Sequence, residues 1–169
     1  TATTISPWIV TAEALQDFRA PAPQRSRPLL PYLRESGPML YDIDLSVGMT
    51  PKGGAETIIA RTNTNQTYYS AAQQLCHHTT SGCAMRTGDL LGSGTISGPE
   101  KDMRGSLLEL SWGGKDPLTL SGAEQRSFIE DGDTMTLYGA ALGAGFRVGF
   151  GACTGTLLPA KPLPDWATT

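Results

Sequence analysis

Alternating apolar and polar residues, the pattern of a half-buried β-strand, recur along most of this chain. The clearest run covers residues 40–49. Its apolar positions are Tyr41, Ile43, Leu45, Val47 and Met49, and its polar positions are Asp42, Asp44 and Ser46. Gly53-Gly54 predicts a turn after this run, and residues 57–61 predict the returning strand of a hairpin.

Shorter apolar runs bounded by glycine, proline and aspartate predict the other strands. They cover residues 3–10, broken by Pro7, and residues 90–93, 106–112, 117–120, 126–129, 134–138, 146–150 and 156–158. Residues 63–80 instead have a helical period, with Asn63 or Asn65 as N-cap and Gly82 at the end. The apolar stripe of this helix is Tyr68, Ala71, Ala72, Leu75 and Thr79. With a short helix at residues 11–15, the expected fold class is mainly β with one long helix, an α+β fold.

A proline-rich segment at residues 19–38 interrupts this pattern. Its prolines exclude a regular helix or a central strand, and they are Pro21, Pro23, Pro28, Pro31 and Pro38. We expect either an extended loop ordered by packing, which Tyr32 and Leu33 could anchor, or a flexible arm. Such a segment could wrap around this chain or cross to a second subunit.

Length and composition are those of one globular domain, with 169 residues, 39% hydrophobic and 17% charged. The 20 glycines and 12 prolines agree with the many turns of a β-rich fold. A net charge of -3 with scattered basic residues predicts neither nucleic acid nor an anionic membrane as partner. Three cysteines without Cys-x-x-Cys spacing, and no apolar run of membrane-span length, predict reduced thiols in a cytoplasmic protein.

The chain begins with Thr1 inside an apolar, β-branched run. Domains seldom begin in the middle of a strand, because the strand would lack a partner along its edge. We therefore expect residues 1–169 to be a single partial domain from a longer protein.

Residues 88–112 contain the two side chains with the strongest chemical pattern. Thr95 lies in a Gly-Thr-Ile-Ser-Gly loop whose amides and hydroxyls could bind a carboxylate or phosphate, or could simply form a tight turn. Glu109 is predicted on a strand, on the face that also carries Leu107 and Ser111. There it could be half of a base dyad or a ligand, or only part of a solvated face.

The other polar candidates are two histidines and two aspartates. His77 and His78 are adjacent on the predicted helix, so their rings diverge by about 100° and cannot chelate one metal together. A capping or core role is expected for them. Asp42 and Asp44 point to the same side of a strand, which suits either a divalent-cation site or an ordinary polar face.

Seven motifs extend over nearly the whole chain. They are Ser6-Pro7-Trp8, residues 27–33 (RPLLPYL), Gln73-Gln74-Leu75 with His77-His78, residues 88–91 (GDLL), residues 93–100 (SGTISGPE), residues 108–112 (LELSW) and Gly149-Phe150-Gly151. In this order, and with almost no change in length, they resemble the C-terminal part of the fumarylacetoacetate hydrolase family.

The resemblance implies a mixed β-sandwich or β-roll fold and a metal-dependent hydrolase. Members of this family cleave the carbon–carbon bond of 4-fumarylacetoacetate in tyrosine catabolism. By resemblance, Glu109 belongs to a His-Glu dyad, Thr95 binds the diketo-acid substrate, and Thr3 belongs to the site of the Mg or Ca ion. A homodimer is also implied.

Part of the family's site has no counterpart in this sequence. The dyad histidine, the metal carboxylates and the oxyanion-stabilising side chains of the family precede the position of Thr1. Neither His77 nor His78 matches the dyad histidine, and Asp42 and Asp44 do not match the metal pair. Two alternatives therefore stay open: a related hydrolase or decarboxylase for another β-diketo acid, and a non-catalytic fragment that serves as a structural or dimerisation core.

Overall fold

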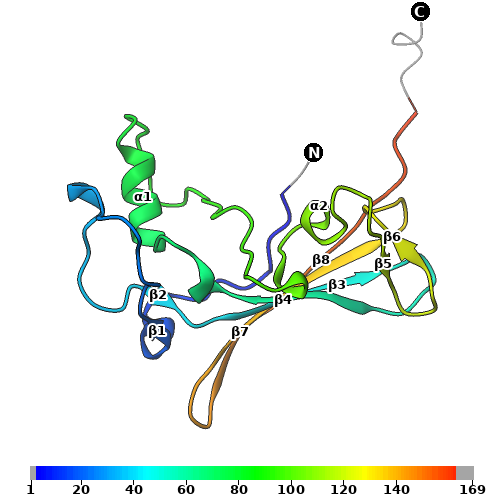
Figure 1. Ribbon diagram of the computed structural model, residues 1–169, viewed down its shortest axis with the longest axis horizontal. Helices are drawn as coiled ribbons and strands as arrows, with labels where there is room; N and C mark the ends of the chain where they lie inside the picture. Colours follow the sequence, from blue (N-terminus) through cyan, green and yellow to red (C-terminus); the bar gives the residue numbers. More distant parts are fainter. Residues whose placement is uncertain (1–2, 163–169) are drawn as a thin grey trace, which may run out of the picture.

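A four-stranded antiparallel sheet forms the centre of the protein in a computed structural model that describes residues 3–162 (Figure 1). The strands lie in the order β4-β3-β7-β8. Their bounds are β3 Asp44–Thr50, β4 Thr57–Asn63, β7 Thr134–Leu142 and β8 Arg147–Thr156. Consecutive strands form hairpins, and the pairing of β3 with β7 joins the two hairpins, with Met49 opposite Met135. The prediction of a mainly β protein is confirmed.

The hairpin predicted around Gly53-Gly54 is present as β3 and β4. The predicted run at 40–49 is divided, because the chain first pairs β2 (Leu40–Tyr41) with β1 (Arg19–Ala20) and only then enters β3. Short strand β5 (Leu118–Thr119) lies within the segment predicted at 117–120 and pairs with β6 (Gln125–Arg126), which overlaps the segment predicted at 126–129 only at Arg126. Strand β7 covers the predicted run at 134–138, and β8 begins at Arg147, one residue inside the predicted run at 146–150. Because β8 continues to Thr156, residues 156–158 do not form the separate strand that was predicted.

Two apolar clusters pack against this sheet. One joins residues of β3 and β4 to helix α2 (Leu107–Leu110) and the β5–β6 region, and consists of Met49, Ile59, Ala60, Leu110 and Leu120. The other joins the sheet to the 3₁₀ helix η1 (Glu13–Phe18), and consists of Leu15, Phe18, Ile43 and Ala141. Helix η1 confirms the short helix expected near residues 11–15, displaced by a few residues.

Helix α1 (Ala71–Thr79) lies within the helix predicted at 63–80, but its N-cap is neither Asn63 nor Asn65. Ser70 caps it, in a reciprocal capping box with Gln73. Asn63 instead caps the separate 3₁₀ helix η3 (Thr64–Gln66). Gly82 follows α1 with φ of 82°, the left-handed conformation that glycine adopts most readily, as expected for the residue that ends a helix.

The proline-rich arm packs against α1 mainly through polar contacts. The buried side chain of Gln73 accepts from Arg25 Nη2 at 3.2 Å and donates to the Leu33 carbonyl at 2.6 Å. Leu33 is buried in the 3₁₀ helix η2 (Pro31–Leu33), whereas Tyr32 is partly exposed and its hydroxyl lies 2.9 Å from His77 Nδ1. The arm is thus extended and anchored at the predicted residues, while the predicted apolar stripe of α1 is largely exposed.

Three other predicted strands are also wrong. Residues 3–10 and 90–93 are irregular, and residues 106–112 contain α2. Within residues 3–162, no helix has the length and hydrophobicity needed to span a lipid bilayer.

The irregular segment at residues 3–10 nevertheless follows the free edge of β8. Ser6 Oγ donates to the Phe150 carbonyl at 2.7 Å, and the Trp8 indole lies against Gly151. Pro7 has no N–H group to offer a neighbouring strand, so this segment cannot continue the ladder as a regular strand. Two motifs from opposite ends of the sequence, Ser6-Pro7-Trp8 and Gly149-Phe150-Gly151, therefore form one contact.

We expect Gly151→Ala to destabilise this contact. Gly151 has φ of 74°, and a Cβ atom there would overlap the Trp8 ring, with Trp8 Nε1 only 3.0 Å away. The left-handed backbone alone costs a residue with Cβ about 1–2 kcal/mol. Chemical denaturation should therefore give a free energy of unfolding lower by at least this amount.

Gly149→Ala is the matched control for this variant. Gly149 lies two residues earlier in β8, and a Cβ atom there would have no neighbour within 4 Å. Equal stabilities of the two variants would contradict the role assigned to Gly151.

Candidate functional site

Glu109 lies on helix α2, not on a strand as the sequence pattern predicted. Ser106 is the N-cap of α2, and its Oγ accepts the Glu109 N–H at 3.3 Å. The spacing Ser106-x-x-Glu109 is that of a capping box, which satisfies free N–H groups at the start of a helix. This spacing was the signal in the sequence that could have predicted the helix, and the apolar alternation of residues 107–110 concealed it.

Two serine hydroxyls hold the Glu109 carboxylate. Ser97 Oγ donates to both carboxylate oxygens, at 3.2 Å to Oε1 and 3.0 Å to Oε2. Ser106 Oγ donates to Oε2 at 2.8 Å. The Ser97 hydroxyl of the glycine-rich loop thus binds a carboxylate of the same chain, and the binding of a ligand carboxylate or phosphate by this loop stays a prediction.

Thr95 lies near the hydrogen bonds of Glu109, because Gly105 contacts both Thr95 and Ser97. The Gly105 N–H donates to Ser97 Oγ at 3.1 Å. A Cβ atom on Gly105 would lie 2.5 Å from the Ile96 carbonyl oxygen and 2.7 Å from Thr95 Cγ2, so only glycine allows this close approach. Thr95 itself lines a cavity of about 210 Å³ together with Leu45 and Tyr138, whereas Glu109 lines a different one, so their membership of one site stays a prediction.

The rest of the loop closes around Arg104. The Gly98 N–H donates to the Met103 carbonyl at 2.9 Å, and Arg104 donates to the carbonyls of Pro99 and Glu100, both at 3.1 Å. Beside Glu109 is a cavity of about 350 Å³, also lined by Lys101, Arg104, Leu108, Trp112 and Gly113. The cationic residues Lys101 and Arg104 near Glu109 were not singled out from the sequence, because their placement depends on how the loop folds.

Thr3 is exposed, and the contacts of the described residues do not join it to Thr95 or Glu109. Its neighbour Thr4 approaches Gly155 of β8, where a Cβ atom would lie 3.6 Å from Thr4 Oγ1. Among residues 3–162, no three His, Cys, Asp or Glu side chains are grouped to hold a metal ion. A divalent cation needs about six oxygen ligands. The described residues therefore do not by themselves fit the Mg or Ca site that the resemblance implies.

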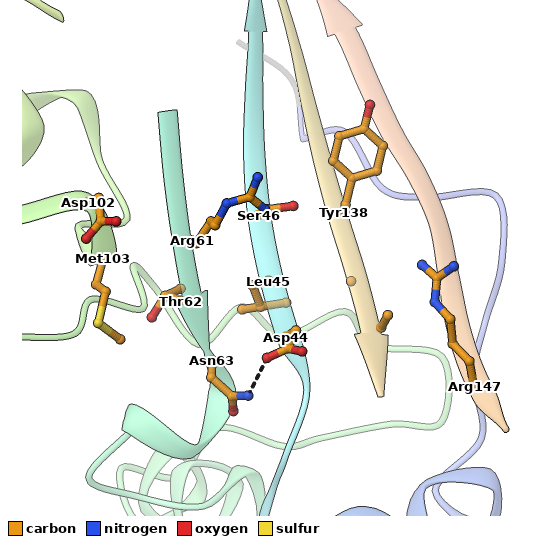
Figure 2. Close-up of a pocket in the computed structure, with 12 residues that line it drawn as sticks. Asp44, Leu45, Ser46, Arg61, Thr62, Asn63, Asp102, Met103, Tyr138 and Arg147 are labelled. Carbon is orange, nitrogen blue, oxygen red and sulfur yellow. Dashed lines mark hydrogen bonds between the residues drawn. The ribbon is translucent and has the colours of Figure 1, made fainter. Parts of the chain in front are cut away.

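A groove of about 540 Å³ lies on the central sheet (Figure 2). Arg61, Asp44 and Arg147 line it, and Glu109, Thr95 and Thr3 do not. Figure 2 shows the Asn63 side chain directed at Asp44, to whose Oδ1 its amide donates at 2.9 Å. The same amide donates to Asp42 Oδ1 at 2.6 Å. The Asn63 amide therefore bridges the two aspartates, because its NH2 group has two hydrogens to donate.

The two histidines occupy the last turn of α1. Both are exposed, and the contact of His77 with Tyr32 joins the helix to the arm. Of the two expected roles, capping or core, the core role is wrong, because both residues lie at the exposed end of α1.

The chain belongs to the fumarylacetoacetate (FAA) hydrolase family, since the family model for the C-terminal domain matches residues 1–157. Its similar proteins include several named fumarylacetoacetase. The Aspergillus fumigatus protein is 53% identical over 165 residues, or 96% of this chain. The proteins of Arabidopsis thaliana and Homo sapiens are 51% and 45% identical, over 95% and 94% of this chain. The chain spans 38% of the length of each of these three relatives.

Proposed function

We propose that this chain is the C-terminal part of the catalytic domain of a fumarylacetoacetase. In the proposed reaction, water is added across a carbon–carbon bond of 4-fumarylacetoacetate, which yields fumarate and acetoacetate. The main support is the Glu109 carboxylate, held by the hydroxyls of Ser97 and Ser106 in the stretch of residues 88–112 that also contains Thr95, in a chain similar to proteins named fumarylacetoacetase over most of its length.

We assign Glu109 the role of the dyad carboxylate. A carboxylate that accepts a hydrogen bond from an imidazole fixes its orientation and stabilises the charge that it gains when water loses a proton. The hydroxyls of Ser97 and Ser106 leave Glu109 with acceptor capacity for such a partner, since two carboxylate oxygens offer about four lone-pair sites. The imidazole would come from the part of the longer protein that this chain does not span. Thr95 is proposed to bind the substrate.

A Mg or Ca ion is part of the proposal, although the described residues do not form its site. Thr3 would contribute at most one oxygen ligand, so the carboxylates that such ions prefer would have to come from elsewhere in the longer protein.

The proposed assembly is a cytoplasmic homodimer in which the sheet is completed into a β-sandwich or β-roll. Support comes from exposed apolar side chains along the segment at residues 3–10, where Ile5, Trp8 and Ile9 are 62%, 68% and 92% exposed. Such a group of side chains is typical of a surface that another chain segment or a second subunit covers.

The test is hydrolysis of 4-fumarylacetoacetate by the longer protein that contains this chain, in Mg or Ca buffer and after chelation. We expect turnover that chelation abolishes, and none from the 169-residue chain alone. An intact longer protein that leaves the substrate unchanged would overturn the proposal. Activity on simpler acylpyruvates only would favour the alternative of a related β-diketo acid hydrolase or decarboxylase.

A further inference from the structure

We propose that Ser97 and Ser106 are positioning residues, whose hydroxyls hold the Glu109 carboxylate in the single orientation that it needs for its role. This inference rests on the proposed function of Glu109. It predicts that replacing either serine lowers the turnover of the enzyme. Of the two serines, Ser97 gives the clearer test.

The direction of each serine proton follows from the neighbouring donors. Ser97 Oγ accepts the Gly105 N–H at 3.1 Å, and Ser106 Oγ accepts the Glu109 N–H at 3.3 Å. In each case the hydroxyl proton is directed to the carboxylate, at 2.8–3.2 Å. Each hydroxyl thus joins a backbone N–H to the Glu109 oxygens, and hydrogen bonds in such chains polarise and strengthen one another.

The two hydroxyls approach Glu109 from two ends of the loop. Ser97 lies before the 3₁₀ helix η4 (Lys101–Met103), and Ser106 lies after it. An exposed glutamate side chain otherwise samples several rotamers, and fixing it costs conformational entropy. Two charge-assisted hydrogen bonds from a closed loop offset that cost before any substrate binds.

Ser97 and Ser106 are not equivalent. Ser106 also caps α2, so its replacement removes a helix cap as well as a contact with the carboxylate. Ser97 lies outside the helix, and its side-chain contacts are with Glu109 and the Gly105 N–H. A variant of Ser97 therefore tests positioning with little direct effect on the helix.

The experiment is a double-mutant cycle in the longer protein, measured as kcat and KM for 4-fumarylacetoacetate. We expect Ser97→Ala to lower kcat about ten-fold with KM nearly unchanged, as for loss of a hydrogen bond to a charged group. Ser97→Thr, which keeps the hydroxyl, should retain most of kcat. In the Glu109→Gln background, Ser97→Ala should cause no further loss, because the group that it positions is already absent.

Ser81→Ala is the matched control, since Ser81 is an exposed serine at the end of α1 whose hydroxyl donates to the His78 carbonyl at 3.0 Å. Its kcat should equal that of the unmodified protein.

Full kcat in Ser97→Ala, with Glu109→Gln inactive, would overturn this inference and leave the proposed function intact. A further loss of the same size in the Glu109→Gln background would also overturn it. If Ser97→Ala does not fold, a kcat for Ser97→Thr as low as that of Glu109→Gln would count against positioning. Full activity in Glu109→Gln would overturn the proposed function itself.

Discussion

Glu109→Gln in the longer protein should lower kcat for 4-fumarylacetoacetate by about 100-fold or more, the usual contribution of a general acid–base group. The amide has nearly the shape of the carboxylate but carries no charge. It could still accept the hydroxyls of Ser97 and Ser106, so the loop should keep its conformation. It would not stabilise an imidazolium, so the loss should appear in kcat much more than in KM.

Glu13→Gln is a suitable control for this variant. Glu13 is an exposed residue of η1, and the substitution makes the same change of charge outside the loop that carries Glu109. Its kcat should equal that of the unmodified protein, and circular dichroism should show both variants folded. If Glu109→Gln keeps most of its activity, Glu109 has no part in the mechanism.

Asp133→Ala should have the largest effect on stability, because it breaks an ion pair in the interior. The Asp133 side chain is fully buried and accepts from Arg126 Nε at 2.9 Å and Nη2 at 3.1 Å, and from the Glu130 N–H at 2.9 Å. Its removal leaves Arg126, whose side chain is 12% exposed, without its main partner. We expect a loss of about 3 kcal/mol in the free energy of unfolding, since Glu124 and Glu130 still neutralise part of the charge.

Asp131→Ala provides the comparison, because Asp131 is an exposed aspartate in the same turn. Denaturant titrations should give a change within about 0.5 kcal/mol for this variant, as is usual at surface positions. A similar loss in both variants would show that the turn, and not the ion pair, determines the effect.

The Arg126–Asp133 ion pair also predicts how the free energy of unfolding depends on pH in the acid range. The hydrogen bond from Arg126 holds the pKa of the Asp133 carboxyl below its ordinary value of 3.8, although burial opposes this shift. Because the folded-state pKa is the lower one, the contribution to stability is complete above the ordinary value and is lost as the pH falls through the folded-state pKa. Unfolding measured between neutral and strongly acidic pH should therefore show a steeper acid loss in the unmodified protein than in Asp133→Ala.

Local pattern was sufficient where neighbouring residues determine the conformation. The hairpin of β3 and β4 follows from the alternating run before Gly53-Gly54 and the short apolar run after it, and the end of α1 follows from Gly82. The pattern failed at residues 106–112, where alternating leucines suited a strand equally well. The hydroxyl of Ser106 favours the helix there, and Leu110 is buried by packing on the sheet. Propensity over a few residues does not decide between such alternatives.

The sequence by itself determined the mainly β composition, the extended proline-rich arm and, through its motifs, the family. It also identified Thr95 and Glu109 as candidate site residues. Only the tertiary structure decided that Glu109 lies on a helix and that Ser97 and Ser106 hold its carboxylate. It also decided that Ser6 contacts Phe150, 144 residues later in the chain. The physical reason is that turns and strand patterns depend on neighbouring residues, whereas these hydrogen bonds depend on how the loop and the ends of the chain pack against the rest of the protein.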